Sequence, residues 1–138
     1  MTTDSVSSKP PSRLLTIDAK PHPITVDVAS TAIIVVDMQN DFGAEGGMFH
    51  RAGIDISSIQ KTVPRIKRVL GVARSAGIPV IYLKMAFKPD LSEAGPVDSP
   101  NHTRHLLLGV GEAAQSPSGA SSRVLIRDTW NTDIISEL

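Results

Sequence analysis

The pattern of hydrophobic and polar residues along this chain predicts both strands and helices. The first clear signal is that of a strand. Residues 32–36 are all apolar and mostly β-branched, which favours extended structure. A run that is apolar on both faces is typical of a central strand in a parallel sheet that helices cover on each side. Ligands bind outside the carboxyl ends of such strands, and Asp37 lies there, followed by Gln39, Asn40 and Asp41. This order predicts a functional carboxylate, although an Asp that only caps the turn would give the same pattern.

A helical period follows between residues 57 and 77. Pro64 is expected in the first turn or between a short lead-in turn and the main helix. Ser57 and Ser58 are candidate N-caps, while Gly77 and Pro79 end the pattern. Five apolar residues recur at spacings of four and three and predict one buried helix face: Ile59, Val63, Ile66, Leu70 and Ala73.

Residues 80–83 then predict a second strand, which makes a right-handed strand–helix–strand unit. Because parallel strands end at the same edge, this unit places Lys84, Met85 and Phe87 beside Asp37. Lys84 either pairs with Asp37, which would favour the ionised carboxylate, or extends into solvent.

The amino-terminal part carries weaker signals. Residues 1–23 show no periodicity and predict a mobile tail, and residues 24–28 alternate apolar and polar positions as a short extended segment does. Gly46 and Gly47 predict a tight reversal after the site motif. His50 follows this reversal and is interpreted as a surface loop residue or a catalytic imidazole.

Residues 86–122 contain few regular signals, and a tract of this length is usually functional, for example as a lid, or disordered. His102 and His105 have a spacing that would suit a metal on a helical turn, but no carboxylate accompanies them, so we expect no metal site. Arg104 is either a contact for an anionic group or a surface residue.

The carboxyl-terminal part predicts a short strand over residues 123–127. Asn131 or Thr132 would cap a following helical turn, with Asp133 favourable at its amino end. Three apolar residues would form the buried face of that turn: Ile134, Ile135 and Leu138.

Composition narrows the function classes. The 138 residues suit one domain, the hydrophobic content of 41% is that of a globular chain, and the formal net charge of zero predicts no binding to nucleic acid or membranes. No apolar run approaches the ~20 residues that span a bilayer, and no export signal is visible, so a cytoplasmic location is expected. The chain has no cysteine, which excludes disulfides and a cysteine nucleophile within these residues.

Several motifs together resemble the isochorismatase-like cysteine hydrolases. Within that superfamily the closest resemblance is to the ureidoacrylate amidohydrolases and the related biuret hydrolases. The segments that carry the resemblance are residues 32–42, Gly46 to Phe49 with Ala52 to Asp55, Glu93 to Pro96 with Ser99 to His102, and residues 130–138. They cover most of residues 24–138, which we expect to form one partial hydrolase domain.

The resemblance implies a Rossmann-like three-layer α/β fold with a parallel sheet, often in a homo-oligomer, that acts on small amide or ureido substrates. In that family a thiolate attacks the carbonyl, ammonia leaves, and water hydrolyses the thioester. The resemblance assigns the acid/base role to Asp37 and implies no cofactor and no metal. Substrate contacts are expected from Gln39, Asn40, Phe42, Lys84, Met85, Phe87, Asn101 and His102.

Three departures from the family pattern matter. Met85 stands where a polar substrate contact is expected, and Phe87 to Asp90 lacks the histidines of the metal-binding nicotinamidase branch. The family's lysine and cysteine would both fall after Leu138, so we expect these 138 residues alone to be marginally folded and inactive. The alternative function is a catalytically silent α/β module that binds a small amide or a partner subunit.

Overall fold

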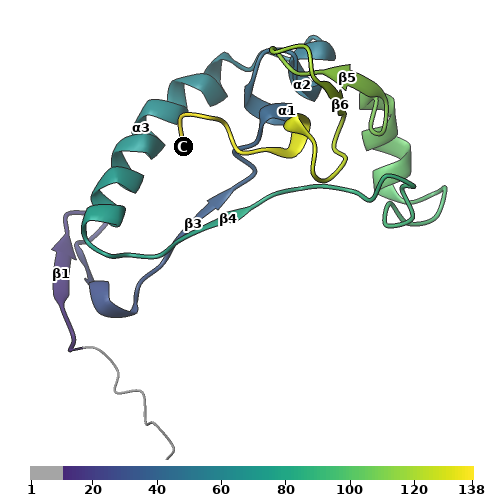
Figure 1. The fold of residues 1–138 in the computed structure, drawn as a ribbon. Coiled ribbons are helices and arrows are strands. Elements are labelled where there is room, and N and C mark those ends of the chain that lie inside the picture. The colour runs from purple at the N-terminus through teal and green to yellow at the C-terminus, as the bar shows by residue number, and fades with distance from the viewer. Residues whose placement is uncertain (1–10) are drawn as a thin grey trace, which may run out of the picture.

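Two parallel strands lie side by side, and the helix that connects them in sequence runs along one side of the molecule (Figure 1). The computed structural model describes residues 11–138, and the predicted tail before residue 11 lies outside the described residues. Strand β3 (Ile33–Val36) pairs in parallel with β4 (Val80–Leu83), and helix α3 (Ser57–Ser75) connects them. The predicted α/β class and strand–helix–strand unit are confirmed.

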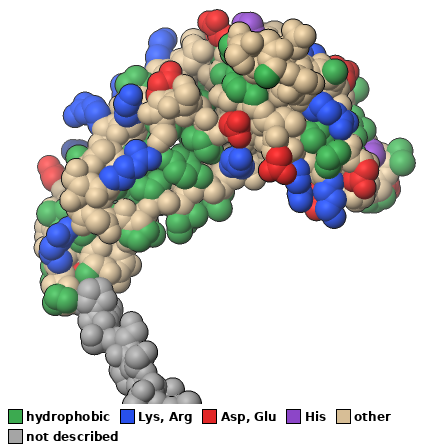
Figure 2. All heavy atoms as spheres, viewed as in Figure 1, with side chains coloured by type: hydrophobic (Ala, Val, Ile, Leu, Met, Phe, Trp, Pro, Cys, Tyr) green, Lys and Arg blue, Asp and Glu red, His purple; other side chains and the backbone are tan. Residues whose placement is uncertain are grey.

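Only one face of the β3–β4 pair is covered by the described residues. Val35 is buried, whereas Ile34, Val36, Ile81 and Leu83 are each about half exposed, with 45–57% of their surface accessible. Hydrophobic side chains lie open along the middle of the molecule in the space-filling view (Figure 2). The prediction of a strand covered on both sides is therefore correct for one side only, and the three-layer arrangement stays a prediction.

Helix α3 buries the predicted stripe through Val63, Leu70 and Ala73. Pro64 lies inside this helix and not in its first turn. The predicted serine caps are wrong, because Asp55 accepts hydrogen bonds from the backbone N–H and the hydroxyl of Ser57 at 2.9 and 3.0 Å. Gly77 ends the helix with a φ of +73°, a conformation in which glycine has no steric penalty.

Residues 14–27 form an antiparallel hairpin of β1 (Leu14–Ile17) and β2 (Ile24–Asp27), with Leu14 opposite Asp27. The extended segment predicted over residues 24–28 is confirmed by β2. The tail predicted over residues 1–23 is wrong for Leu14–Ile17, which form β1. The Asp27 carboxylate accepts from the backbone N–H of Arg13 at 2.8 Å and of Ala29 at 3.0 Å. These bonds join the hairpin to the short 3-10 helix η1 (Val28–Ser30).

Two short helices follow β3 and reverse the chain. Helices α1 (Asn40–Gly43) and α2 (Met48–Arg51) flank the predicted reversal, where Gly46 has a φ of +86°. A Cβ at Gly47 would lie 2.1 Å from the carbonyl oxygen of Asn40, so only glycine fits at this crossing.

The tract over residues 86–122 contains short elements and is not structureless. A π-helical turn η2 (Asn101–His105) leads into the 3-10 helix η3 (Leu106–Leu108), and β5 (Ala113–Gln115) pairs antiparallel with β6 (Ser121–Arg123). The strand predicted at residues 123–127 is thus displaced toward the amino end. Val124 and Leu125 form a buried turn instead, and Ile126, also buried, makes an isolated parallel β-bridge with Phe87.

The carboxyl-terminal segment forms the 3-10 helix η4 (Trp130–Thr132). The helical turn predicted after residue 132 is wrong, because Asp133 is extended with a φ of −70° and a ψ of 150°. Ile135 is nevertheless buried as predicted. The chain crosses between α1 and α3 (Figure 1), and the Leu138 carbonyl oxygen accepts from Arg74 and Tyr82, each at 2.7 Å. Over residues 11–138 no helix has both the length and the apolar character needed to cross a membrane.

The crossing at Gly47 predicts a large effect from one methyl group. Gly47→Ala should reduce the free energy of unfolding by more than about 2 kcal/mol, because its Cβ meets backbone that cannot rotate away. Gly71→Ala is the matched control: nothing lies within 4 Å of a Cβ there, and it should stabilise α3 by about 0.5–1 kcal/mol. Urea denaturation measures both, and equal stabilities of the two variants would contradict the close approach.

Candidate functional site

Asp37 ends β3 at the edge of the parallel pair, as the sequence predicts. Its backbone N–H donates to the Leu83 carbonyl oxygen at 2.9 Å and so adds a last bond after the paired strands. Its φ of +57° lies in the left-handed region, which is uncommon for a residue other than glycine. The side chain is exposed and lines a cavity of about 470 Å³.

The wall of this Asp37 cavity is almost entirely apolar. Leu125 contributes to it with a φ of +50°, a second left-handed residue at the same place. Strained backbone of this kind costs about 1–3 kcal/mol and clusters at functional sites. Six of the lining side chains are aromatic or flexible: Phe42, Phe49, Met38, Met48, Met85 and His105.

Gln39 is fully buried and does not line the Asp37 cavity, contrary to the expected substrate contact. Its side-chain N–H donates to the Met85 carbonyl oxygen at 2.9 Å, and its amide oxygen accepts from the Met85 N–H at 2.8 Å. The Gln39 side-chain amide therefore bonds to the Met85 backbone in the way that the backbone of a neighbouring strand would. These two bonds hold the segment that follows β4 in place.

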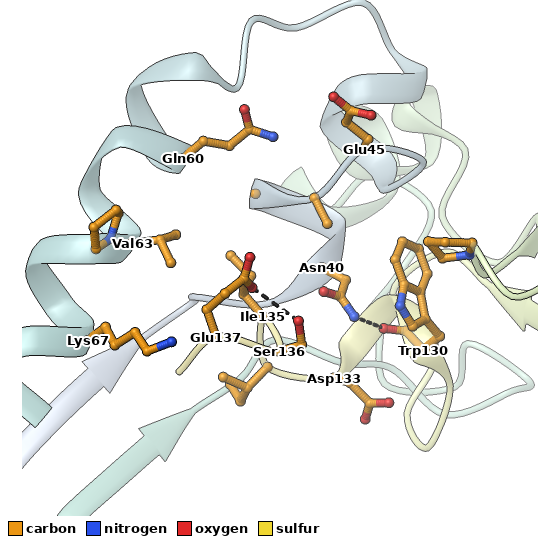
Figure 3. Close-up of a pocket in the computed structure, with 15 residues that line it drawn as sticks. Asn40, Glu45, Gln60, Val63, Lys67, Trp130, Asp133, Ile135, Ser136 and Glu137 are labelled. Atoms are coloured by element: carbon orange, nitrogen blue, oxygen red, sulfur yellow. Dashed lines mark hydrogen bonds between the residues drawn. The ribbon is translucent and has the colours of Figure 1, made fainter. Parts of the chain in front are cut away.

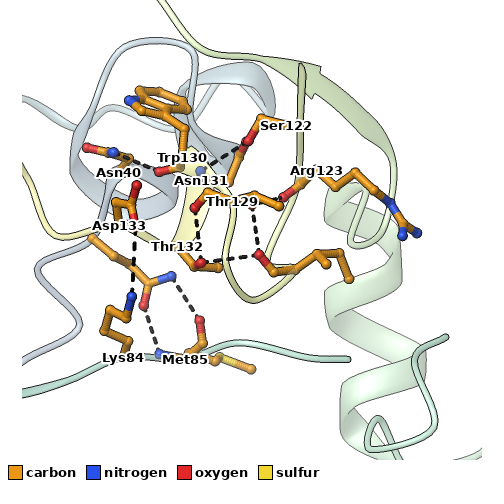
Figure 4. A network of polar contacts seen from close by, with 12 residues as sticks. Asn40, Lys84, Met85, Ser122, Arg123, Thr129, Trp130, Asn131, Thr132 and Asp133 are labelled. Carbon is orange, nitrogen blue, oxygen red and sulfur yellow. Dashed lines mark hydrogen bonds and ion pairs between the residues drawn. The ribbon is translucent and has the colours of Figure 1, made fainter. Parts of the chain in front are cut away.

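Asn40 and Lys84 are also used in contacts within the protein (Figure 4). The Asn40 amide donates to the Trp130 carbonyl oxygen at 2.7 Å. Lys84 lies 4.0 Å from the carboxylate of Asp133, so the possible pair with Asp37 is replaced by this exposed pair. Neither residue lines the Asp37 cavity.

The remaining predicted contacts separate into two groups. Phe42 and Met85 line the Asp37 cavity, and the Phe42 ring lies 4.9 Å from that of Phe49. Phe87 is buried in the core, where its N–H donates to the Leu125 carbonyl oxygen. Asn101 and His102 belong to η2 but do not line this cavity; His105, from the same turn, does.

The sequence reasoning missed Asp41, the most connected polar side chain of the site. This fully buried carboxylate accepts from the backbone N–H of Met48 at 2.9 Å and of Leu125 at 2.6 Å, and from the side-chain amide of Asn131. Burial raises the pKa of the Asp41 carboxyl, against the opposite effect of these three hydrogen bonds. Its place four residues after Asp37, within the same motif, is the one signal that pointed to it.

Asn131, which donates to Asp41, is itself hydrogen-bonded to Ser122 (Figure 4). The Ser122 hydroxyl donates to the side-chain oxygen of Asn131, and it accepts from the Asn131 backbone N–H at 3.2 Å. Because Ser122 lies on β6 and Asn131 on η4, the network connects the β5–β6 hairpin to the helix that carries Asp41.

A second, larger cavity of about 770 Å³ lies between α3 and the carboxyl-terminal segment (Figure 3). Charged side chains of both signs line this cavity: the basic Lys67 and the acidic Glu45, Asp133 and Glu137. Asp37 does not line it. Within residues 11–138, no group of three His, Asp or Glu side chains is arranged to hold a metal ion.

An acidic side chain at the carboxyl end of a parallel strand, beside an apolar cavity, lies where α/β domains bind their ligands. The isochorismatase domain matches residues 31–138, so this chain belongs to the isochorismatase family. The expected family is confirmed.

The chain is similar to several proteins that share the name ureidoacrylate amidohydrolase RutB. The chain is 39% identical over 127 residues to the ureidoacrylate amidohydrolase RutB of Rhizobium rhizogenes, which covers 92% of this chain and 50% of the relative. It is 39% identical over 124 residues to RutB of Agrobacterium fabrum, covering 90% and 53%, and 35% identical over 125 residues to RutB of Methylorubrum extorquens, covering 90% and 49%. The chain therefore spans about half the length of these relatives.

The hydrogen bonds of Gln39 predict that replacing it by a glutamate of the same shape lowers the stability of the protein. Gln39→Glu should lower the free energy of unfolding at neutral pH by about 1–3 kcal/mol, because an ionised carboxylate faces the Met85 carbonyl oxygen without a proton to donate. Gln60→Glu, on the exposed face of α3, should change it by less than about 0.5 kcal/mol. Thermal unfolding at pH 7 compares them, and a neutral Gln39→Glu would remove Gln39 from its structural role.

The raised pKa of Asp41 predicts how the free energy of unfolding changes with pH. Its pKa is raised in the folded state, so its contribution to stability is fully present below the ordinary Asp pKa and is lost as pH rises through the folded value. Asp41→Asn should remove this slope from the unfolding free energy measured between about pH 3 and pH 7.

Asp27→Asn provides the opposite control for that measurement. The backbone hydrogen bond from Arg13 lowers the pKa of Asp27, so its contribution is present above the ordinary pKa and is lost as pH falls through the folded value. Identical pH profiles for the native chain and Asp41→Asn would contradict the assignment to Asp41.

Proposed function

We propose that this chain supplies the acid/base half of an amidohydrolase site for small ureido or amide substrates, with Asp37 as the residue that carries the proton. The observation that carries the proposal is the position of Asp37, exposed at the end of β3 and on the wall of an apolar cavity. Family membership and the similarity to the RutB ureidoacrylate amidohydrolases support it.

The reaction needs a nucleophile that residues 1–138 do not contain, because the chain has no cysteine. In the proposed mechanism a thiolate from the part of the protein after Leu138 attacks the ureido carbonyl and forms a tetrahedral intermediate. Asp37 takes the thiol proton and gives it to the departing nitrogen, so ammonia leaves as the acyl-enzyme forms, a thioester from an amide and a thiocarbamate from a ureido group. Water then adds to this acyl-enzyme and Asp37 accepts its proton. The thiolate is released and the proton on Asp37 returns to it.

The Asp37 cavity has properties that suit this chemistry. Its volume falls within the ~300–1,000 Å³ of small-molecule sites. Phe42 and Met85, both expected as substrate contacts, line it with apolar surface that would exclude water around a short substrate. An apolar surrounding also strengthens the electrostatic contribution of a carboxylate to the transition state.

The uncovered face of β3–β4 supports a second body of protein at this site. Val36 and Leu83, which directly precede Asp37 and Lys84, are about half exposed. Burial of apolar surface gives roughly 25 cal/mol per Å², so a covering segment would gain stability there. We propose that the lysine and the cysteine of the family reach Asp37 from such a segment.

The test compares two lengths of the protein. The 138-residue chain should release no ammonia from ureidoacrylate or biuret above a buffer blank, and a chain continued to the length of the relatives, with lysine and cysteine, should release it. In the longer chain Asp37→Asn should lower kcat by about 10²–10⁴-fold, because proton transfer is lost. Circular dichroism checks that the variant stays folded.

Asp98→Asn is the control for that substitution, because Asp98 is an exposed carboxylate outside both cavities. It should leave kcat unchanged. Turnover that survives Asp37→Asn would remove Asp37 from the mechanism. A longer chain that is stable, binds amides and releases no ammonia would favour the catalytically silent binding module.

A further inference from the structure

The charged residues of this chain are unevenly distributed between α3 and the remainder. Helix α3 contains five basic residues and no acidic one, whereas the whole chain has 14 of each kind. The rest of the chain therefore carries nine bases and 14 acids. Basic side chains are visible along the side of the molecule that α3 occupies (Figure 2). The zero net charge thus conceals a basic helix and an acidic remainder.

Three of the bases form one exposed row on α3. Lys61, Arg65 and Arg68 are separated by four and three residues, so they are neighbours on the helix surface. Like charges at this spacing repel each other and weaken a helix. None of the three is among the bases that form ion pairs within residues 11–138. A partner that carries negative charge would relieve this repulsion.

Exposed apolar side chains lie beside this row. Val69 and Val72 are 53% and 71% exposed. They line a groove of about 440 Å³ together with Ile33 of β3, and Arg65 and Arg68 also belong to its wall. This surface, which we name the α3 groove, therefore combines apolar area with positive charge.

The loop that follows β4 has the complementary character. Residues 90–98 contain three acidic residues and no basic one. Val97 is 83% exposed. Asp98, next to it, is exposed and forms no ion pair within the described residues 11–138. The Val97–Asp98 loop thus presents an apolar side chain beside a free carboxylate.

The α3 groove and the Val97–Asp98 loop are too far apart to meet within one copy. Helix α3 lies on the left of Figure 1, and the loop that follows β4 lies on the right. A contact between them therefore joins two copies. It is a heterologous contact, in which each copy contributes a different surface.

We propose that the α3 groove of one copy of this chain binds the Val97–Asp98 loop of a second copy. Val97 packs on the two exposed valines of the groove. The Asp98 carboxylate accepts hydrogen bonds from the guanidinium groups of Arg65 and Arg68, a charge-assisted pairing. The proposal does not depend on the proposed function, because the groove lies at the amino end of β3 and the Asp37 cavity at its carboxyl end.

The charge distribution favours a second copy over nucleic acid or an anionic membrane. Both of these would attract α3, but the acidic remainder of the chain would repel their phosphates. A second copy instead supplies an apolar side chain and a carboxylate from one short loop. Its own acidic surface is also attracted to the basic helix.

The first experiment measures the association of the 138-residue chain by sedimentation velocity between about 1 and 200 µM, because a small interface of this kind associates weakly. We expect the mean mass to rise with concentration. Raising the NaCl concentration from about 0.05 to 0.5 M should weaken the association, since salt screens charge pairs.

Variants of the two surfaces should complement each other when they are mixed. The groove variant carries Arg65→Glu with Arg68→Glu, and the loop variant carries Val97→Ser with Asp98→Ser. Each alone should raise the dissociation constant at least about tenfold. An equal mixture should form a dimer and nothing larger, because only the intact groove of one variant and the intact loop of the other can bind. Circular dichroism checks that both variants stay folded.

A charge exchange and a matched control complete the test. Adding Asp98→Arg to the groove variant should restore association to within about tenfold of the native chain, because the two charges are then reversed together. Lys67→Glu makes the same charge change on α3 at a residue that lines the other cavity, and it should change the dissociation constant by less than about twofold.

A native chain that stays monomeric over this concentration range would overturn the proposal, and so would a mixture of the two variants that stays monomeric. A monomeric native chain that sediments with phosphatidylserine vesicles would assign the basic row to a membrane instead. A chain of the relatives' full length that stays monomeric would show that its own later part covers the groove, which also overturns the contact between copies.

Discussion

The buried carboxylate of Asp41 holds together three parts of the chain that are far apart in sequence. It accepts from Met48 at the start of α2, from Leu125 in the turn after β6, and from Asn131 in η4. Each donor would otherwise be a buried N–H without a partner, which is costly to leave. Met48 and Leu125 also line the Asp37 cavity. The cavity wall is therefore positioned by a carboxylate that does not line it.

The same hydrogen bonds explain how strained backbone persists at the cavity. Asp37 and Leu125 both have positive φ, although neither is glycine. Such residues remain only where surrounding contacts determine their conformation. The Leu125 N–H is fixed by Asp41, and the Asp37 N–H is fixed by the Leu83 carbonyl oxygen. The turn at Asp37 takes its side chain out of the strand, and Gln39 then pairs with the backbone of Met85. Exposure of the Asp37 carboxylate follows from this local geometry.

Sequence patterns predicted the parts of the fold that depend on local periodicity. The apolar run before Asp37, the stripe on α3 and the position of β4 each follow from residues close in the chain. Asp37, Phe42 and Met85 came to one cavity because the carboxyl ends of parallel strands meet. Asp41 was not recognised, since its role depends on hydrogen-bond partners in distant segments. Strand β5 was not predicted, and β6 and η4 were misplaced, for the same reason: long-range hydrogen bonds fix these elements, and periodicity does not.

The uncovered face of the β3–β4 pair connects the fold to the proposed chemistry. A proton carrier acts best where water is excluded, because the low dielectric strengthens its interaction with the reacting atoms. Asp37 is exposed, and the apolar residues before it, Val36 and Leu83, are about half exposed. A segment that buried these two side chains would also bring Asp37 out of bulk solvent. The stability of the sheet and the environment of Asp37, the proposed acid/base residue, would therefore both change with burial of this one face.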